Sequence, residues 1–125
     1  MLFRSVIAAD FGETVQKLRM TPFTYLAIIT RGHTFDEEAL RVLLRQEPAY
    51  IGVIGSRRRV ETVLRKLASE GYDRERLAAV YAPIGLDIGS ETPEEIALSI
   101  IAEIIAVRRG GTASSLSRQG RPMAF

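Results

Sequence analysis

A short uncharged run over residues 49–54, followed by Gly55 and Ser56, constrains the fold of this chain more than any other feature. The run is rich in β-branched side chains, which predicts a buried strand. Gly55 ends this strand, and Ser56 can cap a helix that continues to Glu70. A strand that enters a helix across such a turn leaves free backbone N–H groups at the positive end of the helix dipole. Because arginines occupy positions 57–59, we expect this helix start to bind a phosphate or another anion.

Along most of the chain, short apolar runs alternate with segments in which apolar residues recur at helical spacing. A second buried strand is predicted over residues 23–30, and weaker strand signals cover residues 2–9 and 80–82. Helices are predicted over residues 11–19, 34–47, 57–70, 73–79 and 93–109. Strands that alternate with helices favour parallel pairing through right-handed crossovers. The predicted fold class is therefore α/β, a three-layer domain with a mostly parallel sheet.

Capping residues stand at several of the predicted helix starts. Asp10 can cap the first helix, and Thr34 with Glu37 forms a capping box for the second. The clearest start is Thr92, which is followed by a proline and, three residues on, by Glu95. The helix that begins there is apolar over most of its circumference, so we expect it to pack on more than one side. We expect one domain over residues 1–110 and a flexible basic tail over residues 111–125.

Three loops are expected to meet at one edge of the predicted sheet. In parallel sheets, ligands bind outside the carboxyl ends of the strands. The loops at residues 30–33, 55–58 and 83–89 fall there, and their glycines allow a ligand to approach the backbone closely. The candidate ligand-binding residues are Thr30, Arg31, Gly32, His33, Gly55, Ser56, Arg57, Arg58, Pro83, Gly85, Asp87 and Gly89.

Each of these candidates also has a plain structural explanation. The Gly55–Ser56 junction is equally explained as a turn before a solvated basic helix, although arginines in a first turn oppose the helix dipole and favour an anionic partner. His33 is the only histidine, and hydrogen bonding in a turn explains it better than metal binding, which needs three or four protein ligands. Asp87 can accept hydrogen bonds from ring N–H groups of a ligand, or it can hold its own loop in an Asx turn.

Composition excludes several classes of function. The 125 residues include no cysteine, so there is no disulfide framework, thiolate metal site or cysteine nucleophile, as in a protein of the reducing cytoplasm. With 17 basic and 15 acidic residues, the chain does not have the excess of positive charge that is typical of nucleic-acid-binding proteins. No apolar run is long enough for a membrane span. No serine with a base and no carboxylate pair requires a catalytic role, so we assign no catalytic and no metal-binding residue.

Three separated blocks of sequence resemble a known family. These blocks are Tyr-Ile-Gly-Val-Ile-Gly-Ser-Arg-Arg-Arg at 50–59, the segment Ala-Pro-Ile-Gly-Leu-Asp-Ile-Gly-Ser-Glu-Thr-Pro-Glu-Glu-Ile-Ala at 82–97, and Ala-Glu-Ile-Ile-Ala-Val-Arg-Arg-Gly-Gly at 102–111. They resemble the carboxyl-terminal domain of the XdhC/CoxI maturation factors, which serve xanthine dehydrogenase and carbon monoxide dehydrogenase. The resemblance runs from about residue 9 to residue 111, with Thr30 and Asp36 also in place.

This resemblance implies a Rossmann-like domain that handles the molybdenum cofactor. Members of the family are taken to bind the cofactor, protect it during sulfuration and deliver it to the apo-enzyme, by binding and hand-over rather than by catalysis. The implied partners are a molybdenum hydroxylase apo-enzyme and a sulfurtransferase. By this interpretation, residues 55–58 hold the phosphate end of the cofactor, and the loops at 30–33 and 83–89 flank its pterin.

Two departures from the family pattern leave alternatives open. The chain begins after the family's first glycine-rich βαβ unit and has no G-x-G-x-x-G, and Tyr81 stands where the family often has histidine. An incomplete Rossmann-like unit exposes a sheet edge and apolar helix faces, so we expect a homodimer or a partner chain to cover them. One alternative is a nucleotide-binding, NAD-dependent oxidoreductase-like domain. A second alternative is a protein-interaction module without a ligand.

Overall fold

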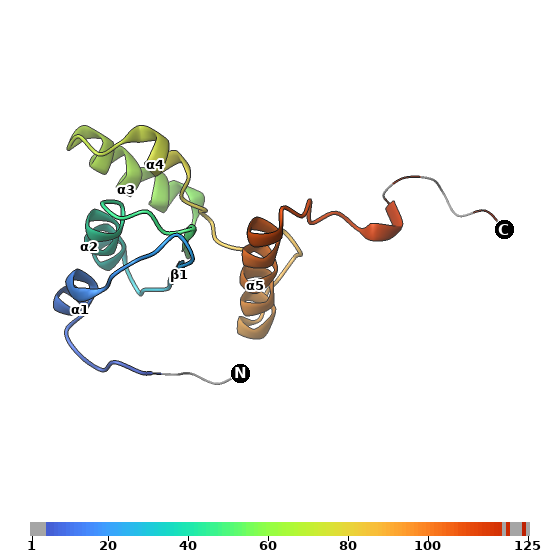
Figure 1. The fold of residues 1–125 in the computed structure, drawn as a ribbon, viewed down its shortest axis with the longest axis horizontal. Helices are drawn as coiled ribbons and strands as arrows, with labels where there is room; N and C mark the ends of the chain where they lie inside the picture. Colours follow the sequence, from blue (N-terminus) through green and yellow to red (C-terminus); the bar gives the residue numbers. More distant parts are fainter. Residues whose placement is uncertain (1–4, 119, 121–123, 125) are drawn as a thin grey trace. The chain divides into compact units, whose positions relative to one another are not determined.

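A computed structural model of the chain describes residues 5–118, 120 and 124, and it divides the chain into two compact units, residues 1–83 and 84–125 (Figure 1). The first unit holds α1 (Phe11–Lys17), β1 (Tyr25–Ile28), α2 (His33–Leu43), β2 (Tyr50–Val53), α3 (Arg57–Ser69) and α4 (Arg74–Ala78). The second unit holds α5 (Pro93–Arg109) and a short 3₁₀ helix, η1 (Leu116–Arg118). No helix among the described residues is both long and apolar enough to cross a bilayer.

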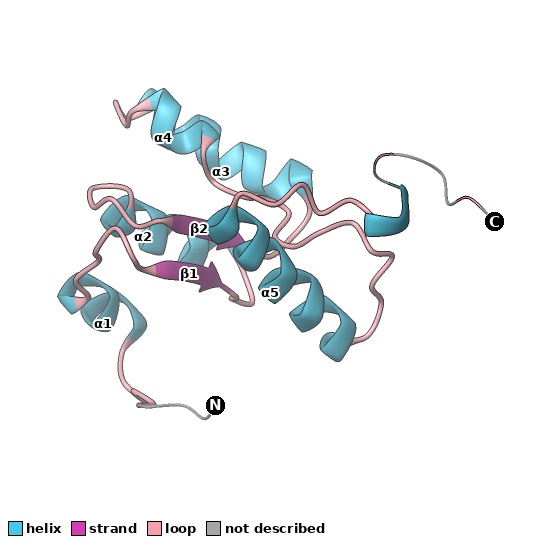
Figure 2. Ribbon diagram, turned by 45° about the vertical axis from the view of Figure 1, so that its right-hand side comes forward, coloured by secondary structure: helices cyan, strands magenta, loops and turns pink. Residues whose placement is uncertain are grey.

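The first unit is a Rossmann-like α/β arrangement built on two parallel strands, β1 and β2 (Figure 2). Tyr25 lies opposite Tyr50 and Ile28 opposite Val53, with α2 as the crossover between the strands. Tyr81 continues the sheet as a single parallel bridge to Gly52. The predicted α/β class and parallel pairing are confirmed, and the strand signal at residues 80–82 corresponds to this bridge.

Alternate strand residues bury one face of the sheet against helices. Leu26 and Ile28 of β1 and Ile51 and Val53 of β2 belong to one cluster with the apolar stripes of α2 and α3. Burying these stripes removes apolar surface from water, which is the dominant favourable term in folding. The buried members of the cluster are Val15, Ile28, Ala39, Leu40, Leu43, Leu44, Ile51, Val53, Val60, Val63, Leu67 and Leu77.

Two predictions for the first unit are wrong. Residues 5–9 form no strand and are exposed, while residues 2–4 of that prediction lie outside the described part. A strand needs a neighbour for its backbone groups, and none pairs with this segment among the described residues. The predicted capping box at Thr34 also fails, because α2 begins one residue earlier, at His33, and Gly32 is its N-cap without a side-chain hydrogen bond.

Helix α5 of the second unit begins and ends as predicted. Thr92 Oγ1 accepts a hydrogen bond from the Glu95 N–H at 3.2 Å, and Gly110 closes the helix in the left-handed conformation. The expectation of burial on several sides is not met, since the buried residues of α5 are Ser99 and Ile100. An apolar stripe instead remains more than half exposed, formed by Leu98, Ile101 and Ile105.

Candidate functional site

The loops after β1 and β2 lie at the same edge of the sheet, because the two strands are parallel neighbours. A polar bridge joins these loops. The Thr30 hydroxyl, after β1, donates to a carboxylate oxygen of Asp36 in the first turn of α2. Arg59 Nη2, from α3, donates to Asp36 Oδ2 at 2.9 Å and to the Ile54 carbonyl at 3.0 Å. We call Thr30, Asp36, Arg59 and the Ile54 carbonyl the loop bridge.

The loop bridge explains why a glycine occupies position 55. Gly55 has a φ of +129°, which L side chains rarely adopt, and a Cβ there would lie 2.7 Å from Arg59 Nη2. Both the backbone conformation and the guanidinium packed against it therefore disfavour a side chain at this position. The plain structural explanation is sufficient for Gly55, and it does not conflict with a ligand close to the same backbone.

The start of α3 offers free hydrogen-bond donors and free positive charge. Ser56 Oγ accepts from the Arg59 N–H at 3.2 Å, and the Val60 N–H donates to the Ser56 carbonyl at 3.1 Å. The N–H groups of Arg57 and Arg58 precede these bonds and have no acceptor among the described residues. Their guanidinium groups are exposed and form no ion pair with a described carboxylate. This combination of backbone donors and guanidinium groups suits phosphate oxygens.

A groove of about 460 Å³ opens beside this helix start. Its lining residues are Glu37, Ser56, Arg58, Arg59, Thr62, Val63 and Lys66. Lys66 Nζ and Arg41 Nη2 each lie 2.6 Å from Glu37 Oε1, and the Lys66 hydrogen bond does most to lower the pKa of the Glu37 carboxyl. With Lys66 and Arg59 paired to carboxylates, Arg58 is the cation of the described lining whose charge is uncompensated.

The other predicted residues of the first loop have simpler surroundings. The Gly32 carbonyl accepts a hydrogen bond from the Thr30 hydroxyl at 3.0 Å. Gly32 has a φ of −164°, and a Cβ there would meet nothing within 4 Å, so any residue fits this backbone. Arg31 is exposed, and His33 is the first residue of α2. The described residues contain no group of three side chains that could hold a metal ion.

The third predicted loop runs from Pro83, at the end of the first unit, into the second unit, where α5 holds it. The Gly85 N–H donates to Glu103 Oε1 at 3.1 Å. A Cβ on Gly85, whose φ is +99°, would lie 2.4 Å from Ser99 Oγ, so packing on α5 accounts for this glycine. Gly89 has a φ of +71° with open space around it.

Asp87 differs from its neighbours in this loop. Its side chain is exposed and accepts no hydrogen bond from any described residue. The Asx turn that would have explained Asp87 structurally is therefore not formed. Its carboxylate stays available to the N–H groups of a ligand.

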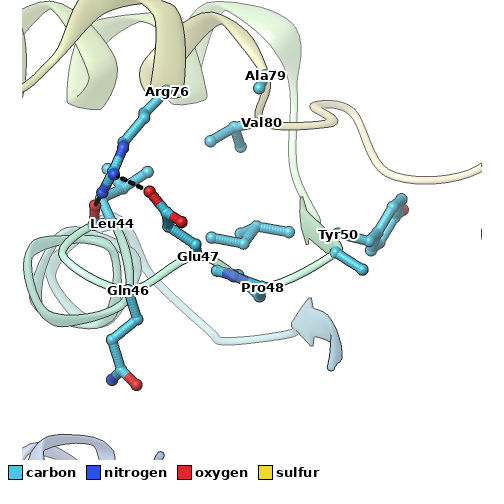
Figure 3. Close-up of a pocket in the computed structure, with 10 residues that line it drawn as sticks. Leu44, Gln46, Glu47, Pro48, Tyr50, Arg76, Ala79 and Val80 are labelled. Atoms are coloured by element: carbon cyan, nitrogen blue, oxygen red, sulfur yellow. Dashed lines mark hydrogen bonds and ion pairs between the residues drawn. The ribbon is translucent and has the colours of Figure 1, made fainter. Parts of the chain in front are cut away.

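A second pocket, of about 180 Å³, lies at the amino end of β2, the end away from the loop bridge (Figure 3). Its one described ion pair joins Arg76 Nη2 to Glu47 Oε1 at 2.5 Å, and Arg76 Nη1 donates to the Leu44 carbonyl at 2.9 Å. Figure 3 shows the Arg76 side chain reaching towards Glu47 at one side of the pocket. Its cation is already compensated and most of the lining is apolar, so we assign no ligand to this pocket.

Sequence reasoning left Arg59 and Asp36 out of the candidate site. The spacing of these two residues from buried residues on the same helices could have identified them. Asp36 stands three residues before Ala39 and four before Leu40, both fully buried, so its carboxylate lies on the buried face of α2 and needs a partner. Arg59 stands four residues before the buried Val63 on α3 and can supply that partner.

The chain matches a known protein family and several known proteins. A family described as the XdhC Rossmann domain matches residues 3–104. The "Uncharacterized protein YqeB" of Escherichia coli is 37% identical over 115 residues, 92% of this chain and 21% of that protein. A protein of Bacillus subtilis that is named as a probable xanthine dehydrogenase subunit is 31% identical over 83% of this chain and 29% of that protein.

Two further comparisons concern a named chaperone and a solved structure. The "Molybdenum cofactor insertion chaperone PaoD" of Escherichia coli is 32% identical over 68% of this chain and 27% of that protein. A crystal structure described as a xanthine dehydrogenase from Bacillus halodurans superposes with a TM-score of 0.68 at 34% identity, over 88% of this chain and 31% of that one. The chain thus spans between 21% and 31% of the length of these relatives.

Proposed function

Since the chain belongs to the XdhC Rossmann domain family, we propose that it matures molybdenum enzymes by binding the molybdenum cofactor and handing it on. Two relatives bear names that connect them with xanthine dehydrogenase and with molybdenum cofactor insertion. They support a maturation role for this chain, in keeping with the sequence resemblance. The role requires retention and release of a ligand rather than a chemical step.

The observation that carries this proposal is the uncompensated positive end of α3. The N–H groups and guanidinium groups of Arg57 and Arg58 have no acceptor or counter-ion among the described residues, although the neighbouring Arg59 and Lys66 are both paired. The cofactor carries a phosphate group, which suits donors of this kind. In this proposal Gly55, Ser56, Arg57 and Arg58 hold the phosphate end.

The pterin end of the cofactor is assigned to the other two loops. Thr30, Arg31, Gly32 and His33 of the first unit are proposed to contact it. The exposed Asp87 carboxylate, in the loop with Pro83, Gly85 and Gly89, would accept hydrogen bonds from N–H groups of the pterin ring. The free state of the Asp87 carboxylate supports this assignment, while Gly85 has a structural reason of its own.

Hand-over requires protein partners. We propose a molybdenum hydroxylase apo-enzyme as the recipient and a sulfurtransferase as the enzyme that acts on the bound cofactor. We also propose that the chain forms a homodimer. The exposed apolar stripe of Leu98, Ile101 and Ile105 on α5 supports an association of this kind, because exposed apolar side chains grouped on one helix face favour burial against another protein.

A thermal-shift titration with isolated molybdenum cofactor, with NAD and ATP as comparators, tests the identity of the ligand. A ligand at about a hundred times its Kd that binds only the folded state adds roughly 2.7 kcal/mol to the free energy of unfolding. We expect stabilisation by the molybdenum cofactor alone. Stabilisation by NAD or ATP instead would favour the nucleotide-binding alternative, and no stabilisation by any of the three would favour an interaction module.

A further inference from the structure

The loop bridge links the two loops that we propose as one binding site. Arg59 Nη2 lies 2.9 Å from Asp36 Oδ2 and 3.0 Å from the Ile54 carbonyl, which directly precedes the phosphate loop. The other Asp36 oxygen accepts from the Thr30 hydroxyl, which also donates to the Gly32 carbonyl at 3.0 Å. A displacement of either loop therefore strains a hydrogen bond made by the other.

We infer that Arg59 is a positioning residue, which fixes the two loops relative to each other, rather than a third arginine that contacts the ligand. This inference rests on the proposed function, because the ligand concerned is the anionic end of the molybdenum cofactor. It gives the three consecutive arginines two different roles. Arg57 and Arg58 bind, and Arg59 holds the binding groups in place.

The state of the Arg59 side chain supports this division. Its Nη2 already donates to two acceptors, and its Nε is buried with no hydrogen-bond partner among the described residues. Its charge is compensated by Asp36, whose side chain is 2% exposed. The guanidinium thus keeps its place between Asp36 and Ile54 although one of its own donors goes unpaired, a geometry that costs free energy.

The packing of Gly55 adds a second reason. A Cβ at Gly55 would lie 2.7–3.0 Å from three guanidinium atoms of Arg59, so the guanidinium lies directly against the backbone of this turn. Arg59 therefore limits the orientations open to the peptide that joins Gly55 to Ser56. That peptide sets the direction of the N–H groups that follow it, which are the proposed phosphate donors.

The test compares Asp36→Asn, Arg59→Gln and the double variant with wild type. The Kd for molybdenum cofactor is measured calorimetrically on the folded protein, far below its melting temperature and at several salt concentrations. Loss of a positioning group around a site typically weakens binding roughly tenfold or more. We expect that loss in each single variant, and no further loss in the double variant, because both substitutions break the same bridge.

The salt dependence separates positioning from direct contact. A charge within a Debye length of the site affects the salt dependence of binding even without contact, so this comparison needs a variant that leaves the net charge of the bridge unchanged. We expect Arg57→Ala to reduce the salt dependence, and the double variant Asp36→Asn/Arg59→Gln, which keeps the net charge of the pair, to leave it unchanged. Arg76→Gln, which breaks the ion pair with Glu47 at the other end of β2, is the matched control and should not change the Kd.

Three results would overturn the inference. An unchanged Kd in Arg59→Gln would mean that the bridge serves stability only, and a reduced salt dependence in the charge-neutral double variant would mean direct contact. If no bridge variant folds, the wild-type chain is titrated with molybdenum cofactor by NMR. The amides of Arg31, Gly32, Arg57 and Arg58 must then shift with one common Kd, and a response confined to one loop contradicts the inference. A wild type that does not bind the cofactor overturns the proposed function as well.

Discussion

The guanidinium of Arg59 lies 2.9 Å from a buried carboxylate oxygen of Asp36, so the first turns of α2 and α3 are joined at the edge of the sheet. Of the three arginines at the start of α3, Arg59 is thus paired with a carboxylate, whereas Arg57 and Arg58 form no ion pair with a described residue. The geometry of the Asp36–Arg59 pair leads to predictions about stability as well as ligand binding.

Loss of the Arg59 guanidinium should destabilise the fold more than loss of an exposed charge. Arg59→Ala leaves the Asp36 carboxylate buried with only the Thr30 hydroxyl as a side-chain donor. We expect a loss of about 3 kcal/mol in the free energy of unfolding, the low end of the range for broken buried pairs, because the Arg59 side chain is 32% exposed. Urea denaturation at pH 7 measures it.

The matched control is Arg76→Ala, which removes an ion pair whose side chains are 40% and 77% exposed. Exposed pairs contribute about 0.2–1 kcal/mol, so the control should cost much less than Arg59→Ala. Equal losses in the two variants would mean that the Asp36–Arg59 pair stabilises the fold no more than an exposed ion pair does.

Three glycine-to-alanine substitutions should rank in a fixed order. Gly55→Ala meets both a positive φ and the Arg59 guanidinium, so we expect a loss of about 2–3 kcal/mol. Gly71→Ala meets only the positive φ, with no atom near the new methyl, and should cost about 1 kcal/mol. Gly32→Ala, at an extended N-cap with open space, should cost about 0.5 kcal/mol, because alanine is a poorer N-cap residue than glycine. Thermal unfolding gives the ranking, and a mild Gly55→Ala would contradict it.

Acid should weaken the link between α2 and α3. The Lys66 ammonium does most to lower the pKa of Glu37, and the Arg41 guanidinium does most to lower that of Glu70. Both carboxyls therefore bind protons less readily in the folded chain, and their contribution is complete above their ordinary pKa of 4.5. This stabilisation decreases once the pH falls below 4.5, and it is lost when the pH has fallen past the lowered pKa values that the two carboxyls have in the folded chain.

Melting temperatures measured from pH 6 to pH 3 test this prediction. Arg41→Gln removes the main cause for Glu70 and one of the causes for Glu37, so the variant should lose less stability than wild type over the acid range. If the melting temperatures of the two proteins fell by the same amount between pH 6 and pH 3, these ion pairs would not be what determines the loss of stability in acid.

The proposed homodimer can be tested at the stripe on α5. Ile101 is 55% exposed in the middle of that stripe, so Ile101→Glu places a charge where apolar burial is expected. Sedimentation should show a dimer for wild type and a monomer for the variant. A wild type that stays monomeric at high concentration would contradict the dimer.

Sequence patterns predicted the elements whose signals are local. The Ser56 and Thr92 caps and the end of α5 at Gly110 follow from side-chain chemistry within a few residues, and all three are found. The parallel pairing of β1 with β2 follows from two apolar runs separated by a helix. The capping box at Thr34 failed because a glycine can take the N-cap position two residues earlier.

The remaining differences depend on contacts that no local pattern contains. The segment at residues 5–9 has the composition of a strand but no neighbour to pair with among the described residues. The role of Arg59 depends on Asp36, which lies 23 residues away in sequence on another helix. The candidate site was predicted as three loops, and the hydrogen bonds that join the first two, through Thr30, Asp36 and Arg59, are defined only by the fold.

The most direct measurement of the central claim is the amount of molybdenum cofactor that remains with the chain after gel filtration. It compares wild type, Arg57→Ala/Arg58→Ala and the control Arg65→Ala/Arg74→Ala, which removes the same charge from exposed positions away from the loops. Circular dichroism establishes that each variant is folded. Retention by wild type and the control, with loss in the Arg57/Arg58 variant, is the predicted result. A folded Arg57/Arg58 variant that retains as much cofactor as wild type would contradict the account.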